Sequence, residues 1–302
     1  MSSTFRAAVV RTPGGPESIE IIDVPVVEPG PGQVRVQIAG ATVNPVDLAV
    51  AAGVFHQLGL IDQPDHTGLG WDFAGIVTAA GPEVDIPVGS RVAGLVAGFD
   101  RDYGAYAEQI VVQATDVALV PDGLDLVEAA TVPVNGLAAA QLVDLLGAGA
   151  GRDLLVTGAA GAVGGYLIPL AQDRGWRVTG LARTTDEKFV RGLGADFTAV
   201  ATPGWDAVAD AAALQEEGLA LVRDGGLFVG VQPSAAPAPQ RGITVHAVQT
   251  RPDGARLAQL LEATAAGDLP ARVYAVVPLD EVADAHRSVA TGGLRGKYVL
   301  RP

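Results

Sequence analysis

The sequence predicts an α/β protein of two domains, a β-rich barrel-like domain and a doubly wound parallel sheet. Three observations lead to this prediction. The chain has 302 residues, which is enough for two domains with separate cores. Before residue 126, segments rich in Val and Ile are separated by Gly and Pro clusters, as in strands joined by turns. After residue 126, strand-like and helix-like segments alternate, which is typical of a parallel sheet covered on both faces.

The predicted elements follow in chain order. The front section is predicted to contain strands at 5–11, 19–24, 33–43, 72–79, 91–97 and 105–112, followed by helices at 126–131 and 137–146. The alternating section is predicted to contain strands at 153–157, 176–182, 196–200, 206–210, 226–231 and 243–248, and helices at 162–174, 186–193, 211–222 and 253–266. The tail adds a strand at 272–277, a helix at 280–290 and a strand at 297–300. We therefore expect one domain of residues 1–122 and 268–302, and another of residues 123–267.

A turn built only of Gly, Ala and Val joins the strand 153–157 to the next helix. Its residues are Gly158, Ala159, Ala160, Gly161, Ala162, Val163 and Gly164. Small residues let the backbone approach a pyrophosphate, and the helix N-terminus offers it unpaired N–H groups. A second strand follows the helix and completes a βαβ unit. We therefore expect a Rossmann dinucleotide site rather than an ordinary turn of a Gly- and Ala-rich chain. An ATP phosphate loop is disfavoured because no Gly-Lys-Ser/Thr follows.

The composition excludes several kinds of site and makes two classes of partner unexpected. The chain has no cysteine, which excludes disulfides, thiolate zinc sites and a cysteine nucleophile. Its net charge of −14 makes nucleic acid and anionic membranes unexpected partners. There is no apolar signal core at the N-terminus and no apolar run long enough to span a bilayer. We expect a cytoplasmic protein, with which the absence of cysteine is compatible.

Three further segments carry a family resemblance. They are VNPVD at 43–47, GWDFAGIV at 70–77 and GKYVL at 296–300. With the glycine turn between them, the chain resembles a medium-chain dehydrogenase/reductase of the zinc-free quinone oxidoreductase (NADPH:quinone reductase) branch, from about Phe5 to Leu300. The resemblance implies a GroES-like β-barrel catalytic domain and a Rossmann NADP(H)-binding domain. It also implies a small hydrophobic electrophilic substrate and a homodimer.

Zinc-dependent relatives carry a cysteine where this chain has Asn44, and a histidine where it has Trp71. A zinc site needs three protein ligands, and the four histidines lack ligand spacing, so no metal is expected. Without a Lewis acid, the expected substrates are acceptors that are already electrophilic, namely quinones or carbonyl-conjugated alkenes. A hydrogen bond to the acceptor oxygen then stabilises the developing anion.

Asn44 is the first candidate for that hydrogen-bond donor. The segment Asn44-Pro45-Val46-Asp47 is also a good helix start, because Asn caps, Pro suits the first position and an acid stands at the third. Capping alone explains these residues, but the resemblance places this turn beside the nicotinamide. We therefore expect both roles together and include Asp47 in the site.

The proton donor is less clear from the sequence. Many relatives have a tyrosine two residues after the Asp of this motif, whereas this chain has Ala49. Tyr103 or Tyr106 is an alternative proton donor, if it reaches the expected cleft that holds the nicotinamide between the domains. Each is also typical of a half-buried aromatic residue of a loop or strand. Asn135, after a proline at the start of the helix 137–146, is either another polar site residue or an N-cap.

The second strand of the βαβ unit indicates the cofactor. NAD-binding folds place an acid at its end, but here no acid precedes Asp186. Arg183 stands where a 2′-phosphate would lie, and Lys188 matches the lysine of the related NADPH-binding pattern. The alternative is that both are solvated charges at a helix start. We expect NADP(H), with Val231 and Lys297 completing its site, although a surface position for Lys297 is equally open.

These observations lead to one main hypothesis and three alternatives. The main hypothesis is an NADPH-dependent reductase that transfers hydride to a quinone or a conjugated alkene. The absence of the tyrosine favours a quinone, because a hydroquinone anion is protonated by water whereas an enone needs protonation at carbon. The alternatives are a non-catalytic NADP(H)-binding sensor or structural protein, a dedicated enoyl reductase of a biosynthetic pathway, and a short-chain dehydrogenase. The last is disfavoured because no Tyr-x-x-x-Lys motif occurs.

Overall fold

The structure is a computed structural model that describes residues 3–96 and 98–302, and the chain divides into two compact units. The first unit contains the chain before Asn135 together with Pro252–Ala266 and Ala271–Pro302. The second unit contains Asn135–Arg251 and Gly267–Pro270. Within the described ranges, no helix combines the length and the apolar character that a membrane span requires.

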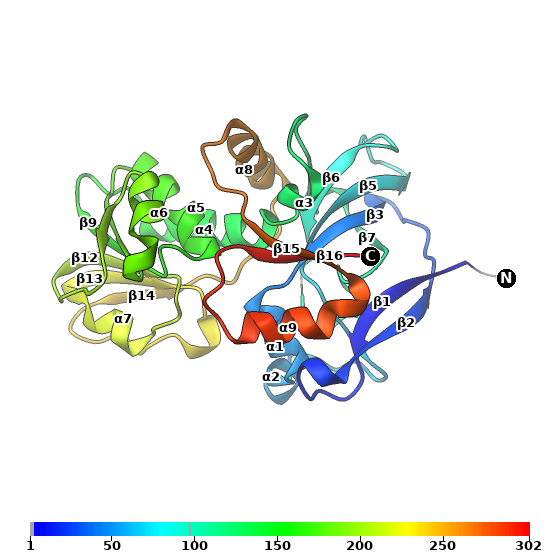
Figure 1. Cartoon of the computed structure of the whole chain (residues 1–302), viewed down its shortest axis with the longest axis horizontal. Coiled ribbons are helices and arrows are strands. Elements are labelled where there is room, and N and C mark those ends of the chain that lie inside the picture. Colours follow the sequence, from blue (N-terminus) through cyan, green and yellow to red (C-terminus); the bar gives the residue numbers. More distant parts are fainter. Residues whose placement is uncertain (1–2, 97) are drawn as a thin grey trace. The chain divides into compact units, whose positions relative to one another are not determined.

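The first unit is built on two sheets (Figure 1). The smaller has the order β2-β1-β4, from Ile19–Pro25, Thr4–Val10 and Thr67–Gly68. The larger has the order β15-β16-β3-β5-β6-β8, with β7 also paired to β3. Its strands are β15 (Val273–Pro278), β16 (Lys297–Arg301), β3 (Gln33–Thr42), β5 (Asp72–Ala80), β6 (Arg91–Leu95), β8 (Val117–Leu119) and β7 (Gln109–Gln113).

Strand β3 shows how the first unit buries its site. Its first half alternates, with Val34, Val36 and Ile38 in the core and the residues between them at least partly exposed. The alternation stops at Gly40, and the last three residues are all buried. The chain is therefore already buried where the turn after β3 begins.

Five α-helices lie wholly within the described part of the first unit. They are α1 (Pro45–Ala51), α2 (Val54–Gln57), α3 (Leu126–Ala129), α8 (Gly254–Ala266) and α9 (Val282–Ala290). Helix α8 packs on β8, and a Cβ on its first residue, Gly254, would overlap the backbone carbonyl oxygens of Thr115 and Val117. Only glycine therefore allows α8 to begin so close to this strand. Helix α9 packs against α1, β15 and β16.

The second unit contains the predicted parallel sheet. Its order is β11-β10-β9-β12-β13-β14, and every neighbouring pair is parallel. The strands are Asp196–Thr198, Arg177–Leu181, Asp153–Thr157, Trp205–Asp210, Val222–Gly230 and Thr244–Ala247 in that order. Helices α5 (Ala162–Asp173) and α6 (Glu187–Gly192) contact β9, β10 and β11, while α7 (Glu216–Ala220) contacts β12 and β13 (Figure 1). This order is that of a doubly wound sheet, so the predicted fold class is confirmed.

Several element boundaries differ from the predictions. The helix predicted at 211–222 is wrong over its first five residues, because the Asp210 carboxylate accepts the Gln215 N–H at 2.8 Å and α7 begins only at Glu216. The strand predicted at 105–112 begins at Gln109, because the Ala105 and Tyr106 N–H groups bond to the loop before β5 instead. Helix α4 (Pro133–Leu146) begins four residues earlier than predicted. Residue 97 of the strand predicted at 91–97 lies outside the described residues.

His286 in α9 is buried without a hydrogen bond. Its side chain is 0% exposed, and neither ring nitrogen has a partner among the described residues. The ring stands edge-on to Tyr106, with the centroids 5.8 Å apart. Burial lowers the pKa of His286 from 6.5 to about 4. The folded protein therefore keeps this imidazole neutral at pH values where the unfolded chain protonates it.

This difference predicts a loss of stability in acid. Between pH 6.5 and 4 the unfolded state binds a proton that the folded state does not, so the free energy of unfolding falls as the pH falls. Between pH 8 and pH 5.5, the native protein should lose about 1 kcal/mol more than His286→Leu. Urea unfolding of both proteins at the two pH values measures this difference. Equal pH dependence in the two proteins would contradict the prediction.

Candidate active site

Asn44 begins helix α1, as the sequence predicts. It has an extended backbone (φ −120°, ψ 156°) and forms a capping box with Asp47. The Asp47 carboxylate accepts the Asn44 N–H at 2.9 Å and the Gly70 N–H at 3.1 Å. Asp47 therefore ties the turn after β3 to the loop before β5. Burial raises the pKa of Asp47 to about 7, against the bond from Asn44 and the nearby charge of Arg101.

The side chain of Asn44 bridges a buried ammonium and a buried carboxylate. Its Oδ1 accepts a hydrogen bond from Lys297 Nζ at 2.6 Å. Its Nδ2 donates to Asp72 Oδ1 at 3.0 Å and to Thr42 O and Oγ1 at 3.2 and 3.3 Å. Asn44 is 1% exposed and Lys297 is 7% exposed. The structure therefore brings the predicted catalytic Asn44 and the predicted cofactor residue Lys297 into one cluster.

Sheet pairing places Lys297 at this position. Strand β16 pairs antiparallel with β3, with Val299 opposite Thr42 and Leu300 opposite Ala41. The Val43 N–H then bonds to the Tyr298 carbonyl oxygen at 3.0 Å. Continued by two residues, this register sets Lys297 across from Asn44. The surface position left open for Lys297 by the sequence is therefore wrong.

Asp72, at the start of β5, provides the carboxyl group at one end of the cluster. Its Oδ1 also accepts the Thr42 hydroxyl at 2.6 Å, and its Oδ2 accepts the Val134 N–H at 3.3 Å in the first turn of α4. Burial raises the pKa of Asp72, while the charge of Lys297 and these hydrogen bonds oppose the rise. Burial likewise lowers the pKa of Lys297, while Asp72 and Asp47 oppose the fall.

Aromatic and cationic side chains surround the cluster. Tyr106 is fully buried and its hydroxyl donates to Thr42 O at 3.4 Å. Arg101 lies over the Trp71 ring, 5.3 Å from its centroid, and donates to Gly70 O at 2.7 Å. Trp71 also packs edge-on against Phe99, with the ring centroids 5.1 Å apart. Sequence reasoning missed Arg101 and Thr42, although Thr42 is a polar residue in a predicted core strand.

Two further residues are predicted from the sequence to be catalytic, and neither is on the surface. Tyr103 is half-buried, and its ring packs edge-on against Phe5 with centroids 5.2 Å apart. Asn135 is buried and is the third residue of α4. Helix α4 begins at Pro133, so the N-cap role considered for Asn135 is wrong. Tyr106, the second tyrosine that the sequence offered, is the one that reaches the Asn44 cluster.

The glycine turn of the second unit is closely packed. Helix α5 begins at Ala162, and its N-cap Gly161 makes no side-chain capping bond. Gly158 has φ +58°, and a Cβ on Gly164 would overlap the Gly158 carbonyl oxygen and lie 2.8 Å from Ala159 Cα. Glycine is therefore required where the helix crosses the turn. The uncapped helix start and the narrow turn fit a dinucleotide pyrophosphate.

The other predicted cofactor residues follow strands of the same sheet. Arg183 comes after β10, has a side chain that is 61% exposed, and places its Nε 3.8 Å from Asp186 Oδ2. Lys188 is exposed on α6, and Val231 follows β13. Because the strands are parallel, Gly158, Arg183 and Val231 all lie at the carboxyl edge of the sheet, the edge that binds ligands in doubly wound folds.

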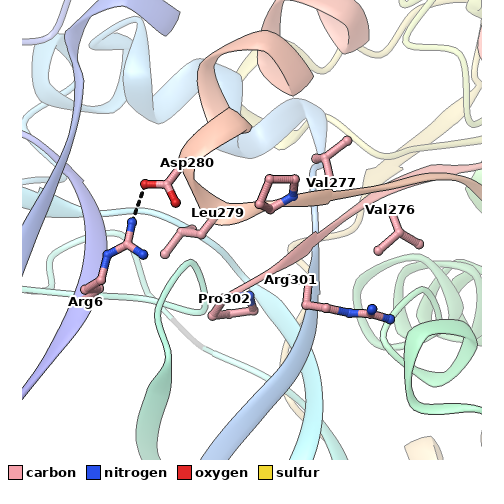
Figure 2. A pocket seen from close by; sticks show the side chains of 8 residues that line it. Arg6, Val276, Val277, Leu279, Asp280, Arg301 and Pro302 are labelled. Atoms are coloured by element: carbon pink, nitrogen blue, oxygen red, sulfur yellow. Dashed lines mark hydrogen bonds and ion pairs between the residues drawn. The ribbon is translucent and has the colours of Figure 1, made fainter.

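A surface hollow of about 440 Å³ lies elsewhere in the first unit (Figure 2). It is lined by Arg6, Val276, Val277, Pro278, Leu279, Asp280, Arg301 and Pro302. Asp280 forms an ion pair with Arg6 (Figure 2). None of the residues predicted for the site lines this hollow, so it is not assigned to the reaction.

Known proteins match this arrangement along most of the chain. The profile of the alcohol dehydrogenase GroES-like domain matches residues 30–122, and that of the zinc-binding dehydrogenase matches residues 184–300. The structure of the quinone oxidoreductase from Coxiella burnetii superposes with a TM-score of 0.87 and 25% identity, covering 99% of this chain and 100% of that one. The chain belongs to the medium-chain dehydrogenase/reductase family. It is quinone oxidoreductase-like, and its family binds nicotinamide cofactors.

Two curated relatives extend the family comparison. The 2-methylene-furan-3-one reductase of Solanum lycopersicum is 28% identical over 295 residues, which are 89% of this chain and 72% of that protein. The pikromycin polyketide synthase component PikAII of Streptomyces venezuelae is 38% identical over 175 residues, 57% of this chain. The match covers only 4% of the length of PikAII.

The packing of the glycine turn generates a prediction. Gly164→Ala should weaken binding of the nicotinamide cofactor about tenfold or more and destabilise the fold by about 1–3 kcal/mol, because the new methyl group must displace the Gly158 backbone. Cofactor fluorescence titration and urea unfolding measure the two effects. Gly192→Ala is the matched control, because a Cβ there meets nothing within 4 Å at the end of α6. An unchanged dissociation constant for Gly164→Ala would show that this turn does not hold the cofactor.

Proposed function

We propose that the chain is an NADPH-dependent reductase that reduces a quinone or a carbonyl-conjugated alkene without a metal. The observation that carries the proposal is the Lys297–Asn44–Asp72 cluster. An amide that holds an ammonium stands where zinc-dependent relatives have a cysteine ligand. Among the described residues, no group of three or more His, Asp or Glu side chains is arranged to hold a metal ion.

The chemistry of this cluster limits the acceptor. A hydrogen-bond donor stabilises negative charge on an oxygen, but it polarises a simple carbonyl much less than a metal does. Acceptors that are already electrophilic suit such a site. The name of the tomato relative describes one, because a 2-methylene-furan-3-one carries a methylene group conjugated to a ring carbonyl.

The cofactor is proposed to bind the second unit. The glycine turn from Gly158 to Gly164 would hold the pyrophosphate, and Arg183 with Lys188 would hold the 2′-phosphate. The side chain of Arg183 is 61% exposed, which supports this assignment, because a phosphate in solution can approach its guanidinium. When bound, the reduced nicotinamide supplies the hydride. The chain itself orients the acceptor and stabilises the charge that develops on its oxygen.

A second candidate function is the reduction of an enoyl thioester in a biosynthetic pathway. The similarity to part of a polyketide synthase component favours it. The two functions share the cluster and the cofactor and differ only in the acceptor. Ala49, at the position of the tyrosine in many relatives, favours the quinone, because a hydroquinone anion is protonated at oxygen and does not require that tyrosine, whereas an enone needs protonation at carbon.

The first prediction concerns the acceptor. NADPH consumption, followed by absorbance, should be fastest with benzoquinone or naphthoquinone and slower with cyclohexenone. An enoyl N-acetylcysteamine thioester in the same panel tests the second candidate function, and NADH is the cofactor control. Tight NADPH binding without consumption by any acceptor would reject the reductase proposal in favour of a sensor.

The next prediction concerns cofactor choice. Arg183→Glu should raise the dissociation constant of NADPH about 10- to 100-fold, because it replaces a phosphate-binding charge by a repelling one. The dissociation constant of NADH should change less than about twofold, because NADH lacks the 2′-phosphate. Arg177→Glu is the matched control, since Arg177 is exposed at the opposite end of β10. Equal weakening of both cofactors by Arg183→Glu would reject the 2′-phosphate assignment.

A further inference from the structure

We propose that the Lys297 ammonium is the group that donates a hydrogen bond, and then a proton, to the acceptor oxygen, while Asn44 and Asp72 position it. This inference rests on the proposed reductase function and assigns its electrophilic group. The sequence suggested Asn44 as the hydrogen-bond donor to the acceptor oxygen and Lys297 as a cofactor residue. The inference assigns the donor role to Lys297 instead.

Asn44 has no amide hydrogen to spare. Its Nδ2 carries two hydrogens, and three acceptors surround it, namely Asp72 Oδ1, Thr42 O and Thr42 Oγ1. A substrate oxygen would have to displace a bond to a buried carboxylate, which is a strong charge-assisted bond. Asn44 is also 1% exposed. Its geometry suits holding the lysine rather than contacting a substrate.

Lys297 has the hydrogens that Asn44 lacks. An ammonium carries three donors, and the structure gives Lys297 Nζ one acceptor among the described residues, Asn44 Oδ1. None of the ion pairs within the described chain involves Lys297. A buried ammonium needs further partners to offset its lost hydration. An acceptor oxygen placed against Nζ would be such a partner.

The surroundings of Lys297 act on its pKa in opposite directions. Burial lowers the pKa of Lys297, and the carboxylates of Asp72 and Asp47, the charged groups that act on it, oppose this. Asp72 reaches the ammonium only through the Asn44 amide, which accepts from Lys297 and donates to Asp72. The negative charge therefore stabilises the ammonium without occupying its remaining hydrogens.

The step balances with the cofactor as the only reductant. The acceptor gains one hydride from the dinucleotide, which is oxidised, and one proton from Lys297. With a quinone, the hydride produces a hydroquinone anion, and the new O–H bond forms as the N–H bond of Lys297 breaks. Water then returns a proton to the neutral amine. The net reaction consumes one quinone, one NADPH and one proton, and yields hydroquinone and NADP⁺.

Removal of the ammonium tests the assignment. Lys297→Met should lower kcat with a quinone about 10²- to 10³-fold, the usual effect of removing one oxyanion donor. The dissociation constant of NADPH should stay within about twofold, since the assigned contact is with the acceptor. Arg301→Met, at the exposed end of the same strand, is the matched control and should retain wild-type kcat. Lys297→Arg should restore part of the rate because it keeps a buried cation that donates hydrogen bonds.

A binding measurement gives a readout besides turnover. 4-Nitrophenol mimics the acceptor oxygen, and its anion absorbs differently from its neutral form. At a pH where free 4-nitrophenol is mostly neutral, the native protein should increase its anionic fraction, and Lys297→Met should not. Circular dichroism and urea unfolding show whether the variant is folded, and Lys297→Gln replaces it if it is not. The 4-nitrophenol comparison then uses the folded variant.

The outcomes separate this inference from the proposed function. If the native protein reduces no acceptor in the panel, the reductase function fails, and the 4-nitrophenol comparison still decides whether Lys297 is an anion-stabilising donor. If the native protein is active and a folded Lys297→Met or Lys297→Gln keeps kcat within about threefold, the inference is overturned while the function stands. An identical absorption change for native and variant protein would also overturn it.

Discussion

The buried carboxylate of Asp72 is the group on which the first unit's site depends. Removing such a charge from water costs several kcal/mol, so it must be surrounded by donors. The Thr42 hydroxyl, the Asn44 amide and the Val134 N–H supply them, and Lys297 adds a positive charge beyond the amide. The three donors and the lysine come from the end of β3, the turn before α1, the first turn of α4 and the start of β16. One carboxylate therefore fixes four segments of the chain around a single point.

The parts of the site that the sequence predicts are those with local causes. Asn44 followed by Pro45 and Asp47 specifies a helix start within four residues, and the structure has it. The glycine turn is likewise set by short-range packing of Gly164 on Gly158. The bond from Lys297 to Asn44 joins residues 253 positions apart. No local sequence pattern encodes such a contact. The sequence alone therefore left two predictions for Lys297, a place in the cofactor site or a place on the surface.

The errors in the predicted helix and strand boundaries have the same cause, namely contacts between residues far apart in the sequence. Residues 211–215 have helical composition, but tertiary hydrogen bonds override it. Thr157 donates to Asp210, and its hydroxyl oxygen accepts the Ala212 N–H from 55 positions away, while Asp210 holds Gln215. Ala213 and Gln215 adopt φ of +56° and +55° in consequence. A propensity summed over neighbours cannot anticipate a backbone held by side chains of another strand. The loop instead packs beside Gly158, where an added Cβ would lie 3.1 Å from the Cβ of Ala212.

The choice of lysine at position 297 is itself informative. The chain uses arginine for nearly all its cations and has lysine only at 188 and 297. An arginine at 297 would keep a positive charge, but its guanidinium does not release a proton and its planar fork favours carboxylates. A lysine is a compact cation whose pKa falls on burial, so it can stabilise an oxyanion and then protonate it. A cation that only stabilised the fold through Asn44 would need neither a compact shape nor a pKa that falls on burial. The retained lysine therefore points to proton transfer, and the amide at position 44 provides the neutral bridge that such a lysine requires.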